Sequence, residues 1–184
     1  IEKYFSPLSN SFKDSLSLKD DAALLRSLNN ENYVLSVDNF IHGTHCPLEL
    51  NPKLGIVRAV LCANSDLSAM AAKPYCMFLS LSLPKKISNL KIEEIAIGLK
   101  NALKLTNMKL GGGDLCSYNG PLAYNITVVG KVNKNGALRR NTAKVGNLLL
   151  VTGALGESKI GLDCLLSGAN NNYLGFRQKN KAIK

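Results

Sequence analysis

Two long segments of alternating apolar residues, Tyr75–Leu83 (YCMFLSLSL) and Leu122–Val132 (LAYNITVVGKV), most constrain how this chain can fold. Alternation with a period of two is typical of a β-strand that presents one apolar face. Only two long helical patterns, over residues 51–73 and 88–103, are available to cover such strands. The sequence therefore predicts a sheet with helices on one face and an apolar second face that a second copy of the chain could cover.

The order of the predicted elements defines the fold class. Asp20 and Asp21 open a short strand that ends near Leu25, and a turn leads into a second strand at residues 33–36. Helix, strand, helix and strand follow, with a last strand at 148–153 and a helix at 158–166, while residues 1–5 are expected to form a helical turn. This mixture, beginning with a hairpin, favours an α+β fold with a mixed sheet over a doubly wound parallel sheet.

The composition is that of a folded domain. The chain has 184 residues, of which 46% are apolar and 20% are charged, as in globular rather than disordered proteins. No apolar run approaches the roughly 20 residues of a membrane-spanning helix, and no signal-peptide pattern is present at the N-terminus. Five cysteines without a CxxC pair favour reduced thiols over a disulfide framework. We expect a cytoplasmic protein without a zinc site.

The formal net charge of +10 is compatible with nucleic acid, an anionic membrane surface or phosphorylated substrates as partners. Part of this charge lies in a basic tail after Phe176, and the basic residues are not interleaved with aromatic residues as in a base-stacking surface. Binding to nucleic acid is therefore disfavoured.

A carboxylate and two imidazoles follow the predicted strand at residues 33–36. Asp38 comes just after it, and a short loop then carries His42 and His45. Loops held by a rigid strand often place polar groups in a ligand-binding cleft. An aspartate at a strand end is also a common turn former, so this segment alone leaves both interpretations open.

The same pattern recurs along the chain. Asp21 opens the first strand, Asp66 lies among small residues of the first predicted helix, and Asp114 follows the three glycines of a predicted turn at Gly111–Gly113. Carboxylates at such positions suit divalent cations that hold phosphate oxygens. Taken singly, Asp66 could equally be a solvated helix residue and the glycines a flexible turn.

Seven short motifs carry a resemblance to a known family. They are DDAALL (20–25), SVDNFIHGTHC (36–46), NSDLSAMAAKP (64–74), LSLSLP (79–84), GGGD (111–114), ALRRNTAKVGN (137–147) and VTGALGES (151–158). In this order, over about residues 1–166, the chain resembles the N-terminal half of the thiamine-monophosphate kinases, which belong to the superfamily of aminoimidazole ribonucleotide synthetase.

The resemblance implies a reaction and a set of roles. The reaction is Mg²⁺-assisted transfer of the ATP γ-phosphoryl group to thiamine monophosphate, giving thiamine diphosphate. The implied metal ligands are Asp21, Ser36, Asp38, Asp66 and Asp114. Gly113 and Asp114 would lie at the ATP phosphates, Arg140 would contact ATP, and His45 would contact thiamine monophosphate. No general base is required, because the acceptor phosphate is already a nucleophile at neutral pH.

The resemblance also implies an organisation of domains and chains. Residues 1–146 would form the ATP- and Mg²⁺-binding and dimerisation domain, and residues 147–184 would begin a C-terminal domain that is mostly absent. The sheets of two chains would close into a barrel, with residues 75–83 and 122–132 near the two-fold axis. Since the family completes its sites with motifs of the second domain, this chain alone is expected to lack full activity.

Four residues depart from the family pattern. They are Lys19, where the family has glycine, and Val37, Leu115 and Cys116, where the family has hydroxyl residues. The alternatives to the kinase are another ATP-binding enzyme of the superfamily, an inactive dimerising fragment, and a basic module that binds nucleic acid.

Overall fold

The computed structural model describes most of the chain as two compact units, residues 1–142 and 143–184. The described residues are 14, 16, 19, 20, 22–26 and 30–166. The helical turn expected at residues 1–5 and the predicted metal ligand Asp21 lie outside the described residues.

The first unit is built on a five-stranded mixed sheet. Its described elements, in chain order, are β1 (Ala23–Leu25), β2 (Glu31–Ile41), α1 (Pro52–Ala69), β3 (Lys73–Pro84), α2 (Asn89–Thr106), β4 (Lys109–Tyr118) and β5 (Ala123–Asn133). The strand order is β1-β2-β5-β3-β4. All neighbouring strands are antiparallel except β3 and β4, which are parallel.

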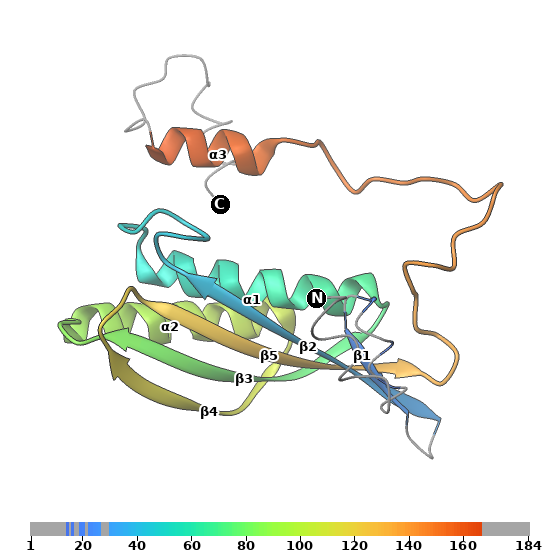
Figure 1. Ribbon diagram of the computed structural model, residues 1–184, viewed down its shortest axis with the longest axis horizontal. Helices are drawn as coiled ribbons and strands as arrows, with labels where there is room; N and C mark the ends of the chain where they lie inside the picture. The colour runs from blue at the N-terminus through green and yellow to red at the C-terminus, as the bar shows by residue number, and fades with distance from the viewer. Residues whose placement is uncertain (1–13, 15, 17–18, 21, 27–29, 167–184) are drawn as a thin grey trace. The chain divides into compact units, whose positions relative to one another are not determined.

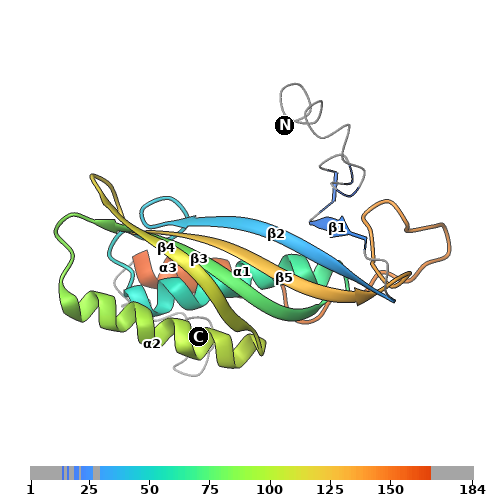
Figure 2. The same ribbon diagram turned by 90° about the horizontal axis from the view of Figure 1, so that it is seen from below.

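Both helices cover the same face of this sheet, as Figures 1 and 2 show. The prediction of an α+β fold with a mixed sheet and helices on one face is confirmed. The sheet of the single chain is open, with β1 and β4 at its edges, so the barrel across a dimer remains a proposal.

The helices begin where the sequence predicts. The Asn51 side chain accepts a hydrogen bond from the Lys53 N–H at 2.8 Å, with Pro52 at the first helical position of α1. Ser88 caps α2 in the same way, by accepting from the Lys91 N–H at 3.4 Å. Each cap satisfies an amide that has no partner within its helix.

The core lies between the helices and the sheet. Strand β5 sends every second side chain towards α1, among them Tyr124, Ile126 and Val128, which are at most 1% exposed. The Tyr124 hydroxyl donates to the Pro52 carbonyl oxygen at 3.1 Å, and burial raises the pKa of this phenol. The two helices approach closely at Gly98, where a Cβ atom would lie 2.5 Å from the Lys53 carbonyl oxygen.

The strand β2 is longer than predicted. It pairs with β5 along its whole length, from Glu31 opposite Asn133 to Ile41 opposite Ala123. Asp38 therefore lies within the strand and not beyond its end. The local pattern predicts an end at Ser36 because polar residues commonly terminate strands, whereas β2 keeps polar residues on the face that meets α1.

The glycine-rich segment expected to form a turn is part of strand β4. A Cβ atom at Gly113 would lie 2.0 Å from the Leu79 carbonyl oxygen, and one at Gly111 would lie 2.9 Å from the Phe78 ring. The glycines thus allow β4 to approach β3, and the register between the two strands shifts at Met77 and Phe78.

The second unit is described from residue 143 to 166 and contains α3 (Glu157–Leu166). This helix confirms the one predicted at residues 158–166. The strand expected at 148–153 is not formed among these residues, since a strand requires a pairing partner and the described part of this unit offers none. No described helix is both long and apolar enough to cross a bilayer.

Candidate functional site

Two of the predicted metal ligands meet between β2 and α1. The Ser36 hydroxyl donates to the Asp66 carboxylate at 2.5 Å, although the two residues are 30 positions apart. Ser36 lies on the helix-facing side of β2 and is 7% exposed. The sequence brings them together because small residues of α1 surround Asp66 and let the helix approach the strand.

Asp38 belongs to the same group. It lies two residues after Ser36 on β2 and so points to the same face of the sheet. Burial raises the pKa of the Cys62 thiol on α1, Arg58 opposes this rise, and the charges of Asp38 and Asp66 add to it. Asp38 and Asp66 thus both act electrostatically on Cys62, and Asp38 shares the helix-facing side of β2 with Ser36. Ser36, Asp38 and Asp66 are called the β2–α1 cluster below.

The segment that carries Arg140 lies at the same end of α1. The Leu138 N–H donates to the Met70 carbonyl oxygen at 3.2 Å, one helical turn after Asp66. Asp20 accepts hydrogen bonds from the Arg139 guanidinium at 3.1 Å and from the Arg140 backbone N–H at 3.0 Å. A guanidinium-bearing segment thus borders the β2–α1 cluster.

Asp20 is a residue of this site that sequence reasoning missed. Its partners are 119 and 120 positions away in the chain, so no local pattern could have identified them. The only signal was its place beside Asp21 in the DDAALL motif.

His45 lies in the loop after β2. Its ring is exposed and stacks on Phe40, with the ring centroids 5.8 Å apart. Its Nδ1 atom accepts a hydrogen bond from the Ile41 backbone N–H at 3.0 Å. A neutral ring that accepts at Nδ1 carries its proton on Nε2. His45 can therefore offer one N–H donor to an anionic ligand.

The other histidine of this loop, His42, is a core residue. It is 3% exposed, and its Nε2 atom has no hydrogen-bond partner. Burial lowers its pKa, the weak contact with the Leu48 carbonyl oxygen opposes this shift, and Lys91 adds to it. The ring lies so close to α1 that a Cβ atom at Gly55 would be 2.7 Å from Nε2.

Gly113 and Asp114 are not brought to the β2–α1 cluster within one chain. Paired positions form a row across the sheet that runs from Asp38 through Ile126 and Leu79 to Gly113. Neighbouring strands lie about 4.8 Å apart, so β2 and β4 are separated by roughly 14 Å. Figure 1 shows β5 and β3 between them.

Asp114 also faces the opposite side of the sheet. It pairs with Ser80, which alternates with the helix-facing residues Leu79 and Leu81. The next position along, Cys116, contacts the Ser82 hydroxyl at 3.4 Å, which confirms the alternation. Asp114 thus lies on the face that the helices leave open.

The donor set of the β2–α1 cluster fits a hard cation in part. Two carboxylates and one hydroxyl are oxygen donors of the kind that Mg²⁺ prefers, and Mg²⁺ commonly takes its remaining ligands from phosphate and water. No group of three or more histidine, cysteine, aspartate or glutamate residues suited to a metal occurs among the described residues. A cation at this cluster would therefore depend on ligands from outside it.

Comparison with protein families defines the class to which this arrangement belongs. The model described as "AIR synthase related protein, N-terminal domain" matches residues 19–132, which include β1 to β5 with both covering helices. The chain therefore belongs to the family of AIR synthase related proteins.

Within this class, the chain is similar to thiamine-monophosphate kinases. It is 34% identical to the thiamine-monophosphate kinase of Buchnera aphidicola subsp. Acyrthosiphon pisum over 165 residues. The aligned region covers 88% of this chain and 50% of the relative. It is 32% identical to the thiamine-monophosphate kinase of Bacillus subtilis over 156 residues, a region that covers 84% of this chain and 48% of the relative. The chain thus spans about half the length of these curated relatives and corresponds to their N-terminal half.

Solved structures agree on the fold. The thiamine-monophosphate kinase of Stenotrophomonas maltophilia has a TM-score of 0.75 and 30% identity, covering 98% of this chain and 59% of its own. The structure described as AaThiL complexed with AMPPCP and TMP has a TM-score of 0.83 at 23% identity, covering 96% and 55% of the two chains.

Proposed function

We propose that this chain is the nucleotide- and metal-binding half of an enzyme that transfers the γ-phosphoryl group of ATP to thiamine monophosphate, giving thiamine diphosphate. The observation that carries the proposal is the β2–α1 cluster, where Ser36 and Asp66 are 2.5 Å apart beside the segment of Arg140. Oxygen ligands for a cation and a guanidinium for phosphate oxygens are what such a transfer requires. The thiamine-monophosphate kinases that share this half support the choice of acceptor.

The proposed roles follow the chemistry of the side chains. Asp38, Asp66 and the Ser36 hydroxyl hold Mg²⁺, together with Asp21. Mg²⁺, when bound, neutralises the charge that develops on the phosphate oxygens. Arg140 binds ATP phosphate oxygens, and Nε2–H of His45 donates to the phosphate of thiamine monophosphate. No side chain has to act as a general base, because the acceptor is itself an anionic phosphate.

The position of Asp114 leads us to propose that the site is shared between two chains. β2 lies towards one side of the sheet and β4 forms the opposite edge. In a symmetric dimer whose open faces meet, with β3 and β5 near the axis, β4 of one copy comes beside β2 of the other. Gly113 of the second copy, which is on the helix-facing side of the sheet as the cluster is, would then supply the phosphate contact. Asp114 of the second copy would place a further carboxylate next to β2, on the inner side of the barrel.

The open face gives this dimer a physical basis. Tyr33, Val37, Tyr75 and Phe78 lie on it and are between 36% and 70% exposed. Apolar surface of this kind, left on one side of an open sheet, is stabilised when a partner covers it. The sheets of the two copies would then form the barrel.

We propose that residues from 147 onwards begin a second domain, which completes the substrate site. The boundary of the compact unit at residues 142 and 143 supports a division in this part of the chain. All five cysteines are free thiols, which supports a reducing compartment such as the cytoplasm.

The test is the binding of a non-hydrolysable ATP analogue with and without Mg²⁺, measured by calorimetry on Asp66→Asn and Asp114→Asn. Each variant should bind the Mg²⁺ complex at least roughly tenfold more weakly, since a ligand oxygen is lost, and should unfold at nearly the wild-type temperature. Co-folding the two variants should restore wild-type affinity in some sites, because a mixed dimer contains one site with both aspartates.

Asp163→Asn, an exposed acid paired with Lys159 within α3, serves as the control and should bind normally. Wild-type affinity in both Asp66→Asn and Asp114→Asn would refute the metal assignment. Weak binding that co-folding does not repair would refute the shared site and leave the nucleotide assignment standing.

A further inference from the structure

The carboxylate of Asp20 joins the start of the described chain to the segment after β5. Its Oδ2 atom accepts the Arg139 Nε–H at 3.1 Å, and its Oδ1 atom accepts the Arg140 backbone N–H at 3.0 Å. The Asp20 side chain is only 4% exposed. A buried carboxylate is destabilising unless its oxygens accept hydrogen bonds. These two hydrogen bonds therefore form a specific link between the two segments, called the Asp20 tie below.

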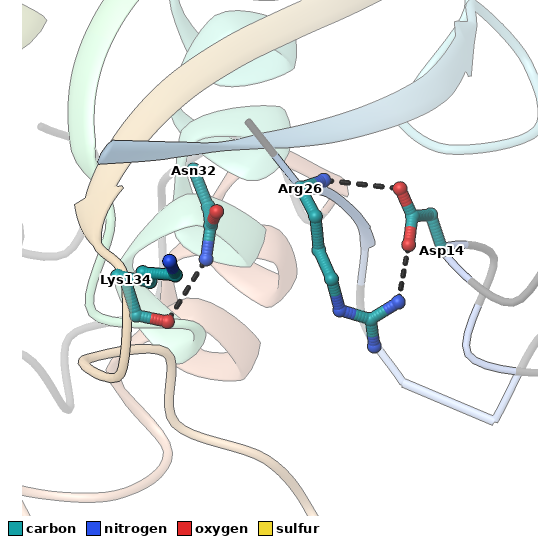
Figure 3. Close-up of polar contacts among 4 residues, drawn as sticks. All are labelled: Asp14, Arg26, Asn32 and Lys134. Atoms are coloured by element: carbon teal, nitrogen blue, oxygen red, sulfur yellow. Dashed lines mark hydrogen bonds and ion pairs between the residues drawn. The ribbon is translucent and has the colours of Figure 1, made fainter. Parts of the chain in front are cut away.

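Two further contacts, shown in Figure 3, hold the segments on either side of this tie. Arg26 donates to the Asp14 carboxylate from its backbone N–H at 3.0 Å and from its guanidinium. The Asn32 side chain donates to the Lys134 carbonyl oxygen at 2.9 Å. The first contact fixes the chain before Asp20 to the end of β1, and the second fixes the turn after β5 to the start of β2.

The segment around Arg140 is also held on its other side. The Thr142 hydroxyl donates to the Arg139 carbonyl oxygen at 2.8 Å, which closes a turn over residues 139–142. The Leu138 N–H bonds to the Met70 carbonyl oxygen. The backbone of Arg140 is therefore fixed by Asp20 at a defined place beside the C-terminal end of α1, where Asp66 lies.

We propose that Asp20 is a positioning residue, which fixes the backbone of Arg140 so that its guanidinium meets the phosphate oxygens of a bound nucleotide. The proposal rests on the function proposed above and separates the roles of the two adjacent aspartates. Asp20 is engaged by two donors and organises the arginine, whereas the role proposed for Asp21 is that of a metal ligand. A guanidinium placed in advance loses less conformational freedom when it binds, which raises affinity.

The test is a mutant cycle between Asp20 and Arg140, with affinity for a non-hydrolysable ATP analogue and Mg²⁺ as the readout. Asp20→Ala and Arg140→Ala should each weaken binding by roughly tenfold. The double variant should bind no more weakly than Arg140→Ala, because Asp20 acts through the arginine. Asp20→Asn should recover part of the loss, since its amide oxygen still accepts the Arg140 N–H.

Glu31→Ala is the matched control, because it removes an ion pair with Lys131 at the same end of the sheet without touching residues 139 or 140. It should leave nucleotide affinity unchanged. Additive losses in the double variant, or normal binding by Asp20→Ala, would overturn the positioning role.

A second measurement does not depend on nucleotide binding. Trypsin should cleave after Arg139 or Arg140 several times faster in Asp20→Ala than in Asp20→Asn or Glu31→Ala, as followed by mass spectrometry, because the tie no longer protects this turn. Equal cleavage rates in the three variants would show that Asp20 does not hold this turn. A wild-type protein without Mg²⁺-dependent nucleotide binding would instead refute the proposed function, and the two failures are thus distinguishable.

Discussion

The two faces of the central sheet differ in how their side chains are stabilised. On the face covered by α1 and α2, Val34, Met77 and Ile126 are at most 1% exposed. On the opposite face, Val37 is 70% exposed and Phe78 is 42% exposed. Strands β2 and β3 supply residues to both sets, alternately along each strand.

This difference shows which part of the fold the single chain completes by itself. The helix-covered face has its packing partners within the described residues of the first unit, and it also holds the β2–α1 cluster. The open face has aromatic and branched side chains of the kind found in cores, and both described helices of the first unit lie on the other face. Substitutions on the open face should therefore affect association, whereas substitutions on the covered face should affect the stability of the monomer.

The largest expected effect is a loss of stability when the covered face is truncated. Ile126→Ala should lower the free energy of unfolding by about 3 kcal/mol, because it leaves a cavity between β5 and α1. Val37→Ala, on the open face, should lower it by less than about 0.5 kcal/mol. Urea denaturation at low protein concentration measures both, and equal losses would break the distinction between the faces.

The next effect concerns association. Val37→Lys should turn the proposed dimer into a folded monomer of 19.8 kDa, because it places a charge in the apolar contact. Leu105→Lys is a close control, since Leu105 on α2 is 69% exposed but lies on the other side of the molecule. Light scattering with circular dichroism distinguishes the outcomes, and a dimer that persists in Val37→Lys contradicts the assignment of the interface.

A smaller effect is a pH dependence that arises on the covered side. Burial lowers the pKa of His42 below its ordinary value of 6.5. The stability linked to this residue is thus fully present above pH 6.5 and is lost as the pH falls towards the folded-state pKa, because only the unfolded chain then binds the proton. His42→Asn should reduce the loss of stability between pH 7.5 and pH 5.5.

His45→Asn, which changes the exposed ring of the same loop, should leave that acid-dependent loss in place. Thermal unfolding over this pH range measures all three proteins. An unchanged pH slope in His42→Asn would show that other groups cause it.

The smallest effect belongs to the polar contact on the open face. The Lys131 ammonium lies 4.4 Å from the centroid of the Tyr75 ring and 5.7 Å from that of Tyr33. Lys131→Met keeps the aliphatic stem and should cost about 0.5 kcal/mol of stability. A loss above about 2 kcal/mol would show that the open face contributes more to the monomer than its exposure indicates.

Most of the fold could be predicted from local patterns. The caps at Asn51 and Ser88 located both helices, and alternation located β3 and β5. The errors arose where tertiary context overrode local chemistry. Gly111–Gly113 form a strand because β4 must approach Leu79 closely, and Asp38 remains within β2 because β5 pairs with the whole strand.

The candidate site was less predictable than the fold. The sequence order of the acidic residues suggested one group, and the structure joins Ser36 with Asp66 and leaves Asp114 on another strand and face. Which strands are neighbours depends on pairing between distant segments, which no local pattern determines. The contact between Asp20 and Arg139 was unpredictable for the same reason.

The place of β5 in the sheet has a consequence for how the chain folds. β5 lies between β2 and β3, although it follows both of them in the chain. During synthesis, β2 can pair only with β1 at first. Its second neighbour in the sheet, β5, is made only after α1, β3, α2 and β4. The hairpin of β1 and β2 and the unit of β3, α2 and β4 must then be joined by one late strand, so we expect slow folding limited by long-range pairing.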